Sequence, residues 1–241
     1  MPKISFVIAT KNRANLINDS LNSLLAQTEP DWEAIVVDDH GNDNTREVVE
    51  GFGDPRIFYY RLPEGRGAGI ASARNYGNMV ASSNLIAVLD SDDLAKPDRA
   101  QRAIAGHKQH SWDFYSTRRE TVGNSPTQAL TKRVEPEKWD AELFKTSSYV
   151  THSSVVYTKK AIMEIPYNSA LPCLVDYDMI SRFIEAGKKM YYDPVVTVTW
   201  RRHDHGTVTG IIPQERRLKF LTLIRNLRGW TKDEIDPKEL V

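Results

Sequence analysis

The sequence is poor in cysteine and has no excess of charge of either sign. Cys173 is its one cysteine, which excludes an internal disulfide and fits a reducing compartment. Its 32 basic and 32 acidic residues give a formal net charge of zero, so no overall field attracts nucleic acid or an anionic membrane. No apolar run approaches membrane-spanning length, and the apolar residues 4–9 are too few for a signal peptide. These absences predict a cytoplasmic protein with no transmembrane segment and no nucleic-acid partner.

The most informative feature that is present is an acidic cluster directly after a short apolar run. Residues 85–89 carry no charge, which is typical of a strand buried on both faces of a parallel sheet. Asp90, Asp92 and Asp93 follow at its C-terminal end, where open α/β sheets bind ligands. Carboxylates this close repel one another unless a cation neutralises them, and hard oxygen ligands suit Mg²⁺ or Mn²⁺. The cluster predicts a metal or ligand site; the alternative is an acidic turn that caps the next helix.

Apolar runs alternate with amphipathic segments through the first half of the chain, which predicts an α/β fold. Strands are expected at residues 4–9, 33–37, 56–62 and 85–89, and helices at residues 14–27, 44–49, 70–81 and 97–110. Asn44 and Glu47 have the spacing of a capping box. Right-handed crossovers between these strands make the sheet parallel, with helices on both faces.

The second half is less regular. Residues 111–148 have no clear period, which indicates either an acceptor-binding insertion or irregular packing. Beyond them, strands are expected at 154–158 and 190–200, the latter interrupted at Asp193 and Pro194, and helices at 175–186 and 214–227. Because no linker or repeat divides the chain, residues 1–241 are predicted to form a single domain.

A glycine-rich segment precedes the helix expected at 70–81. Gly65, Gly67 and Gly69 alternate, whereas a dinucleotide-binding fingerprint needs Gly-x-Gly-x-x-Gly close to a strand end. The sequence therefore predicts a mobile loop here and not a dinucleotide site.

Six segments occur in one order along the chain and carry a family resemblance. They are residues 5–13, 36–39, 73–75, 88–93, 175–178 and 201–203. Together they resemble the family-2 glycosyltransferases, inverting enzymes of the GT-A fold that use nucleotide-sugar donors. The resemblance implies one Rossmann-like GT-A domain with a mostly parallel central sheet. It implies a nucleotide-sugar-binding half at 1–110, an acceptor-binding and catalytic half at 111–210, and an amphipathic helix and tail at 211–241.

The resemblance also implies roles for residues at the strand ends. Thr10 and Asp39 are expected beside the base and ribose, and the Arg74 guanidinium suits diphosphate oxygens. The full implied set of nucleotide-sugar-binding residues is Thr10, Asn12, Arg13, Asp39, Arg74, Asp90 and Ser91. A UDP-sugar is the family's commonest donor.

A metal site and a base complete the implied machinery. Asp90 and Asp92 match the family's Asp-x-Asp motif, and Asp92, Asp93 and His203 are the implied ligands of Mn²⁺ or Mg²⁺. His205 is the alternative to His203. Asp176 matches the general base, but Val175 stands where the family often has Glu. Asp178 as the base, or Asp176 as a helix cap only, are therefore alternatives.

The implied reaction transfers a sugar, with inversion, to a hydroxyl of a glycan or lipid-linked acceptor in polysaccharide assembly. One alternative is a non-catalytic nucleotide-sugar-binding module; another is a sugar nucleotidyltransferase, which residues 10–15 disfavour because they contain no glycine-rich loop. The basic amphipathic helix at 214–227 predicts packing on its own domain, packing in a homodimer, or peripheral contact with the inner face of the membrane.

Overall fold

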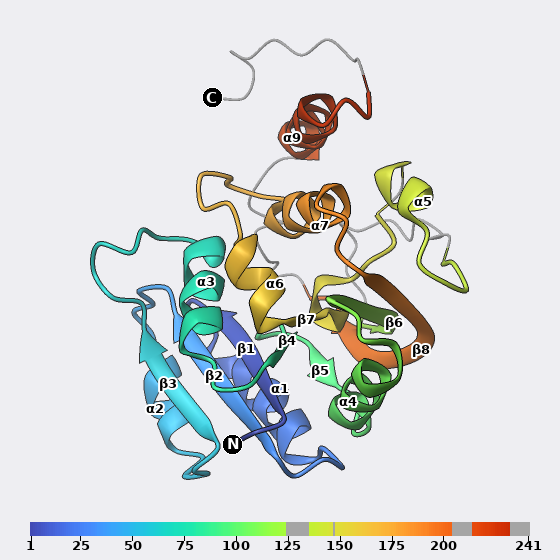
Figure 1. The fold of residues 1–241 in the computed structure, drawn as a ribbon. Coiled ribbons are helices and arrows are strands. Elements are labelled where there is room, and N and C mark those ends of the chain that lie inside the picture. The colour runs from blue at the N-terminus through green and yellow to red at the C-terminus, as the bar shows by residue number, and fades with distance from the viewer. Residues whose placement is uncertain (124–134, 147, 204–213, 232–241) are drawn as a thin grey trace.

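A single sheet with helices on both faces organises the chain (Figure 1). The computed structural model describes residues 1–123, 135–146, 148–203 and 214–231. Within these ranges the strands are β1 (Ile4–Thr10), β2 (Trp32–Asp38), β3 (Ile57–Arg61), β4 (Leu85–Val88), β5 (Leu94–Ala95), β6 (Phe114–Val122), β7 (Val156–Thr158) and β8 (Met190–Arg201). The helices are α1 (Ala14–Leu25), α2 (Thr45–Glu50), α3 (Ile70–Val80), α4 (Arg99–His110), α5 (Ala141–Thr146), α6 (Lys159–Glu164), α7 (Val175–Glu185), α9 (Gln214–Leu227) and the 3₁₀ turn η1 (His152–Ser154).

The first four long strands confirm the predicted parallel α/β arrangement. The sheet order is β3-β2-β1-β4-β7-β6-β8-β5, and β1 pairs in parallel with both β2 and β4. Successive side chains of β1 enter two different cores, because strand side chains alternate between faces. Val7 packs with α3, α6 and α7, whereas Phe6 and Ile8 pack with α1, α2 and α4. Both faces of β1 are therefore buried, which explains why this strand contains no charged residue.

The sheet continues into an antiparallel part that the sequence analysis did not recognise. β7 pairs antiparallel with β4 and β6, and β6 runs parallel to β8. Residues 111–148, where the sequence showed no clear period and no helix or strand was predicted, contain β6 and α5. β6 shows no simple period because its first four residues are buried and its last three are exposed.

Two local predictions also change. β8 runs through Pro194 without interruption, because its register against β6 shifts there and absorbs the missing amide donor. The capping box at Asn44 does not form, since that side chain makes no cap bond to α2. Asp43 replaces it and accepts hydrogen bonds from the backbone of Thr45 at 3.1 Å and of Ala14 at 3.0 Å.

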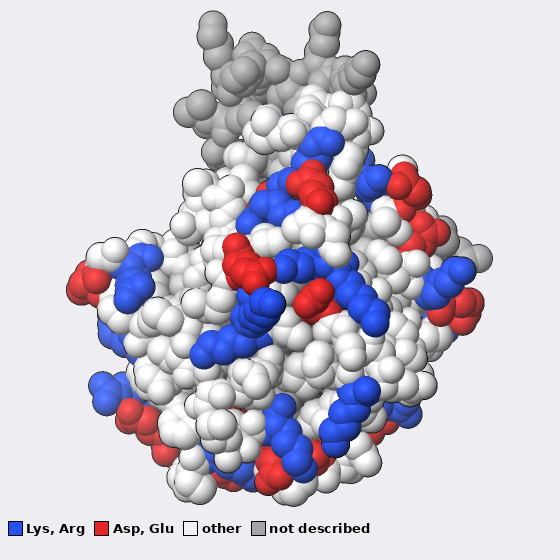
Figure 2. All heavy atoms as spheres, in the orientation of Figure 1, with Lys and Arg blue, Asp and Glu red and all other residues white. Residues whose placement is uncertain are grey.

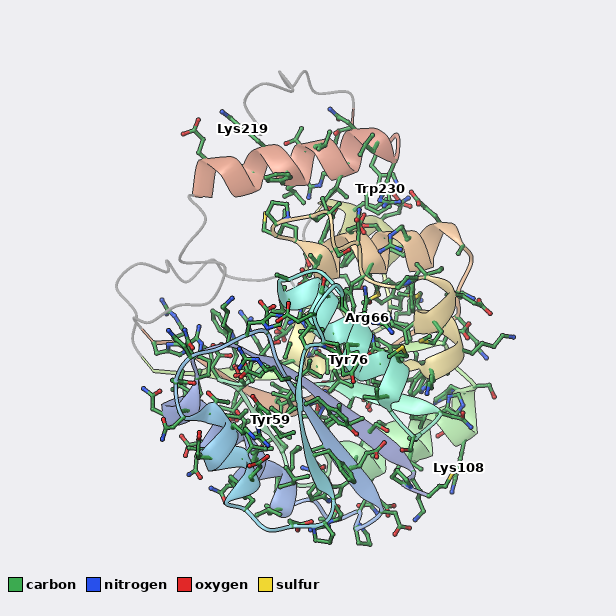
Figure 3. The ribbon with its side chains drawn as sticks, turned by 90° about the vertical axis from the view of Figure 1, so that its left-hand side faces the viewer. Tyr59, Arg66, Tyr76, Lys108, Lys219 and Trp230 are labelled. Atoms are coloured by element: carbon green, nitrogen blue, oxygen red, sulfur yellow. The ribbon has the colours of Figure 1, made fainter. Side chains whose placement is uncertain are left out.

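Helix α9 packs on its own domain, against α7 (Figures 1 and 3). Phe220 and Ile224 are buried, and Arg225 donates to the Tyr177 hydroxyl at 3.2 Å. Trp230, at the end of the chain segment after α9, meets the Tyr177 ring edge-on with centroids 6.3 Å apart. This packing accounts for the apolar residues in the middle of the helix, whereas Leu218 and Leu227 near its ends are exposed. Among the described helices, none has the length and apolar character needed to cross a membrane.

The approach of α3 to the sheet yields a prediction about stability. A Cβ at Gly77 in α3 would lie 2.5 Å from Val7 Cγ1. We expect Gly77→Ala to lower the free energy of unfolding by about 1–3 kcal/mol, because overpacking outweighs the gain in helix propensity. The control is Gly106→Ala in α4, where the nearest atoms would lie at an ordinary 3.5 Å. That variant should be neutral or gain up to about 1 kcal/mol in chemical denaturation. Equal effects of the two substitutions would contradict this account.

Candidate functional site

The C-terminal ends of β1, β2 and β4 meet at one edge of the sheet because the strands are parallel. Thr10 ends β1, and its Oγ1 is buried without a hydrogen-bond partner among the described residues. Asp39 follows β2; its carboxylate accepts from the Gly69 amide at 3.0 Å and lies 3.7 Å from Lys11 Nζ. The glycine-rich segment therefore lies against Asp39, one of the predicted donor-binding residues.

The loop after β1 connects the donor edge to the acidic cluster. Asn12 has a left-handed φ of 53°, and its Oδ1 accepts from the Asn42 amide at 2.7 Å. This contact braces the loop that follows Asp39. Arg13 NH1 reaches to 3.9 Å from Asp92 Oδ2. Of Asn12 and Arg13, only Arg13 therefore reaches the acidic cluster.

Arg74 and Asp90 form a buried ion pair beside the sheet edge. Arg74 is 4% exposed, donates to Asp90 Oδ1 at 2.6 Å and lies over the Tyr167 ring. Burial by itself raises the pKa of the Asp90 carboxyl, but the Arg74 guanidinium and His152 outweigh it and hold that pKa below its usual range. Asp90 is therefore ionised and fixed in place.

Asp93 has its oxygens engaged within the protein. Its Oδ1 accepts from the Arg201 amide at 3.1 Å, and its Oδ2 accepts from the Ser153 hydroxyl. Burial and the neighbouring carboxylates of Asp90 and Asp92 raise the pKa of Asp93. This geometry does not support the metal-ligand role predicted for Asp93. It assigns the residue to holding η1 and the end of β8 beside the acidic turn.

The acidic turn itself is held from α1 and β8. Ser20 Oγ lies 2.8 Å from the Ser91 carbonyl and 2.7 Å from the Asp93 carbonyl. The Arg201 guanidinium donates to the Asp92 carbonyl. The alternative that this turn caps the next helix is wrong, because the N-cap residue of α4 is Asp98. Sequence analysis assigned no role to Ser20 or to Arg201: a single polar residue on a helix gives no motif, and within the segment 201–203 a role was expected only for His203.

Asp92 and His203 come together across 111 positions of the sequence. Asp92 Oδ2 lies 3.0 Å from His203 Nε2, and Asp92 is 5% exposed. Two ligands at right angles on an ion with bonds of about 2.1 Å are also about 3.0 Å apart, so the pair fits one edge of an octahedral Mg²⁺ or Mn²⁺ site. In the described part of the chain, no group of three acidic, His or Cys side chains is preformed around a metal. The rival ligand His205 lies outside the described residues.

Helix α7 separates the two candidates for the base. Asp178 is 5% exposed and pairs with Arg182 at 2.8 Å and with Arg228 beyond α9 at 2.7 Å. These contacts make Asp178 an anchor for α9. Asp176 is half-buried, and no described residue hydrogen-bonds to its carboxylate. Asp176 is also not the helix cap, because the N-cap residue is Leu174, with φ 57°.

Left-handed backbone at residues other than glycine concentrates at this site. The described residues of this kind are Asn12, His40, Ser111 and Leu174. Asn12 is itself a predicted site residue, His40 follows Asp39, and Leu174 precedes Asp176 by two positions. Such conformations cost roughly 1–3 kcal/mol each and persist where the surrounding structure imposes them. Three of these positions are thus residues of the candidate site or neighbours of such residues.

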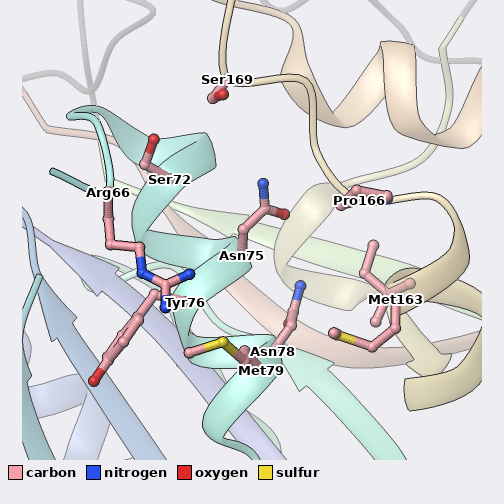
Figure 4. A pocket seen from close by; sticks show the side chains of 10 residues that line it. Arg66, Ser72, Asn75, Tyr76, Asn78, Met79, Met163, Pro166 and Ser169 are labelled. Atoms are coloured by element: carbon pink, nitrogen blue, oxygen red, sulfur yellow. The ribbon is translucent and has the colours of Figure 1, made fainter. Parts of the chain in front are cut away.

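Two other surface features lie apart from this edge. A cavity of about 310 Å³ between α3 and α6 is lined by residues that include Arg66, Ser72, Tyr76 and Met163 (Figure 4). None of its lining residues belongs to the predicted donor, metal or base set. The face in Figure 2 mixes basic and acidic side chains without a continuous basic patch. Neither feature competes with the sheet edge as the candidate site.

Comparison with known proteins gives partial matches to longer glycosyltransferases. The chain is 41% identical over 109 residues to a validoxylamine A glucosyltransferase of Streptomyces hygroscopicus subsp. jinggangensis, covering 44% of this chain and 26% of that protein. It is 26% identical over 250 residues to a chondroitin synthase of Pasteurella multocida, covering 98% of this chain and 25% of that protein. The chain thus spans about a quarter of the length of both relatives.

Solved structures share the fold. The S. aureus TarS 1–349 structure in complex with UDP-GlcNAc matches with a TM-score of 0.77 and 19% identity, over 98% of this chain and 69% of that one. A Pyrobaculum calidifontis mannosyltransferase in complex with GDP-Man and Mn²⁺ matches with a TM-score of 0.70 and 16% identity, over 99% and 66%. The single α/β domain is therefore structurally similar to GT-A glycosyltransferases. The family model described as glycosyl transferase family 2 matches residues 5–165, and the chain belongs to that family.

Proposed function

We propose that this chain transfers a sugar from a nucleotide-diphosphate sugar to an acceptor hydroxyl, with inversion, in the assembly of a polysaccharide or glycan. One observation carries the proposal. The Arg74–Asp90 pair and the Asp92–His203 pair share a strand-end edge with the Asp176 carboxylate, which has no hydrogen-bond partner among the described residues. The glucosyltransferase name of one relative, and the structural neighbours in complex with UDP-GlcNAc or GDP-Man, support a nucleotide-sugar donor.

The donor's nucleotide lies, in this proposal, along the edge formed by Thr10 and Asp39. The unsatisfied Thr10 hydroxyl and the Asp39 carboxylate are available acceptors for ribose hydroxyls or a base imide. The diphosphate extends toward Arg13 and Arg74, which supply positive charge where the leaving group accumulates negative charge. UDP is the proposed nucleotide.

The chemistry requires a base opposite the leaving diphosphate. The Asp176 carboxylate removes the proton from the acceptor hydroxyl while the hydroxyl oxygen forms a bond to the anomeric carbon. The bond from that carbon to the diphosphate oxygen breaks, and its electron pair leaves with the diphosphate. Asp176 lies in the first turn of α7.

The proposed metal ligands are Asp92 and His203. A divalent ion held there, Mn²⁺ or Mg²⁺, would neutralise charge on the diphosphate. Asp93 is left out of the ligand set, because its oxygens already hold η1 and β8.

The chain divides functionally, in this proposal, within its one domain. Residues 1–110 bind the nucleotide-sugar, and residues 111–210 seat the acceptor beside α7. The acceptor is a glycan or lipid-linked sugar. The packing of α9 on α7 uses Arg225 and Arg228 internally, so the part of residues 211–241 that the structure describes supports a structural role for the helix more than a membrane-binding one.

The metal assignment makes the first functional prediction. Asp92→Asn should weaken Mn²⁺-dependent binding of UDP by about tenfold or more, because it removes one of two charged or basic ligands. Isothermal titration calorimetry with and without Mn²⁺ measures this directly. Asp98→Asn, on the exposed start of α4, is the control and should bind as wild type does. Unchanged Mn²⁺-dependent binding by Asp92→Asn would refute the metal site.

The assignment of Asp176 as the base makes the second functional prediction. Asp176→Asn keeps the shape of the side chain but removes its basicity, so transfer should fall about a hundredfold or more while UDP affinity is retained. The matched variant is Asp178→Asn, two residues along the same helix. It should lose roughly 1–3 kcal/mol of stability by weakening the pairs with Arg182 and Arg228, and keep its turnover per folded molecule. The reverse outcome would move the base to Asp178.

A further inference from the structure

His152 is a buried histidine at the site that the family resemblance did not single out. It opens η1, is 7% exposed, and its Nε2 lies 2.8 Å from the Tyr167 hydroxyl. Its other ring nitrogen, Nδ1, is buried and has no hydrogen-bond partner among the described residues. A buried polar atom left unpaired in this way requires an explanation, and a missing ligand or water is one.

The surroundings of Nδ1 identify what is missing. Nδ1 lies 4.0 Å from Asp90 Oδ1, which is too far for a direct hydrogen bond. One oxygen atom bonded to both would make two contacts of about 2.8 Å that meet at roughly 90°, a geometry that a hydroxyl group can satisfy. The gap therefore matches a single hydroxyl.

The direction of the hydrogen bonds is also consistent with a hydroxyl. In the tautomer with the proton on Nδ1, beside the Asp90 and Asp176 carboxylates, Nε2 accepts the hydrogen bond from the Tyr167 hydroxyl. Nδ1–H then donates to the bridging oxygen, and the proton of that oxygen is donated to Asp90. Burial and the Arg74 guanidinium lower the pKa of His152, so the ring is neutral and binds an uncharged group.

The position of the gap between His152 and Asp90 indicates which hydroxyl binds there. Asp90 is bound to Arg74, which we assign to the diphosphate, and Asp176 is close enough to act on the charges of Arg74 and His152. The sugar must lie between the diphosphate and the base that serves its anomeric carbon. We infer that His152 and Asp90 together bind one hydroxyl of the transferred sugar, so that His152 is a specificity-determining residue. This inference rests on the proposed function.

Two substitutions separate the ring nitrogens of His152. The amide of Gln occupies the place of Nε2, whereas the amide nitrogen of Asn occupies the place of Nδ1. We expect His152→Gln to bind UDP as wild type does but to lose about tenfold in affinity for the UDP-sugar, because only the sugar contact is removed. His152→Asn should retain most of that affinity. Calorimetry measures both affinities. The donor is whichever of UDP-glucose, UDP-N-acetylglucosamine and GDP-mannose binds wild type most tightly, and the nucleotide of that donor is the reference ligand.

Deoxy analogues of that donor locate the hydroxyl. One monodeoxy sugar should bind wild type and His152→Gln equally, since it lacks the group that His152 contacts. Tyr167→Phe preserves the ring packing and should show the same selectivity, with a smaller loss of affinity for the UDP-sugar. His107→Gln is the control: His107 Nδ1 is also buried without a hydrogen-bond partner among the described residues, but its ring meets Trp112 edge-on, away from Asp90.

The outcomes that overturn the inference are distinct from failure of the proposed function. Equal losses for nucleotide and nucleotide-sugar in His152→Gln, or equal losses for every deoxy analogue, would show that His152 only supports the fold. Circular dichroism of each variant checks that it is folded. A wild-type protein that binds none of the nucleotides would overturn the proposed function together with this inference.

Discussion

The site depends on one buried carboxylate that binds no substrate in our proposal. Asp93 accepts a hydrogen bond from Ser153 and another from the amide of Arg201, and so ties the end of β4 to η1 and to the end of β8. Ser153 is next to His152, and Arg201 is two residues before His203. The same contacts therefore bring His152 to Asp90 and His203 to Asp92. A buried carboxyl group without hydrogen-bond partners would be destabilising, so these contacts offset the cost of burying Asp93.

The sheet supplies the second constraint. Parallel pairing of β1 with β2 and β4 puts Thr10, Asp39 and Asp90 at one edge, independently of the conformation of the loops between them. The antiparallel pair β7 and β6 then extends the sheet and places β8 where its C-terminal end reaches the acidic turn. In our proposal the donor-binding residues and Asp92 thus follow the parallel strands, whereas His203 follows β8 in the other part of the sheet.

Charge pairing distinguishes residues of the same type that lie close in sequence. Asp92 faces His203, whereas Asp93, next to it, is hydrogen-bonded inside the protein. Asp176 has no described partner, whereas Asp178 holds Arg182 and Arg228. In each pair the residue that retains unused acceptor capacity is the one suited to chemistry, and the other stabilises the structure around it. Strained backbone at Leu174, just before Asp176, is consistent with a position imposed by tertiary packing.

The sequence alone determined the fold class, the order of the parallel strands and helices, and the acidic cluster at a strand end, because periodicity and strand-end position are local properties. Its family motifs predicted Thr10, Asp39, Arg74, Asp90, Asp92, Asp176 and His203. It did not predict β6, whose burial changes along its length, nor the roles of Ser20, Ser153 and Arg201. The division of work between Asp92 and Asp93, and between Asp176 and Asp178, was decided only by tertiary structure. Carboxylates are chemically identical in sequence, and only the donors that packing brings to them from distant segments make one structural and leave the other available.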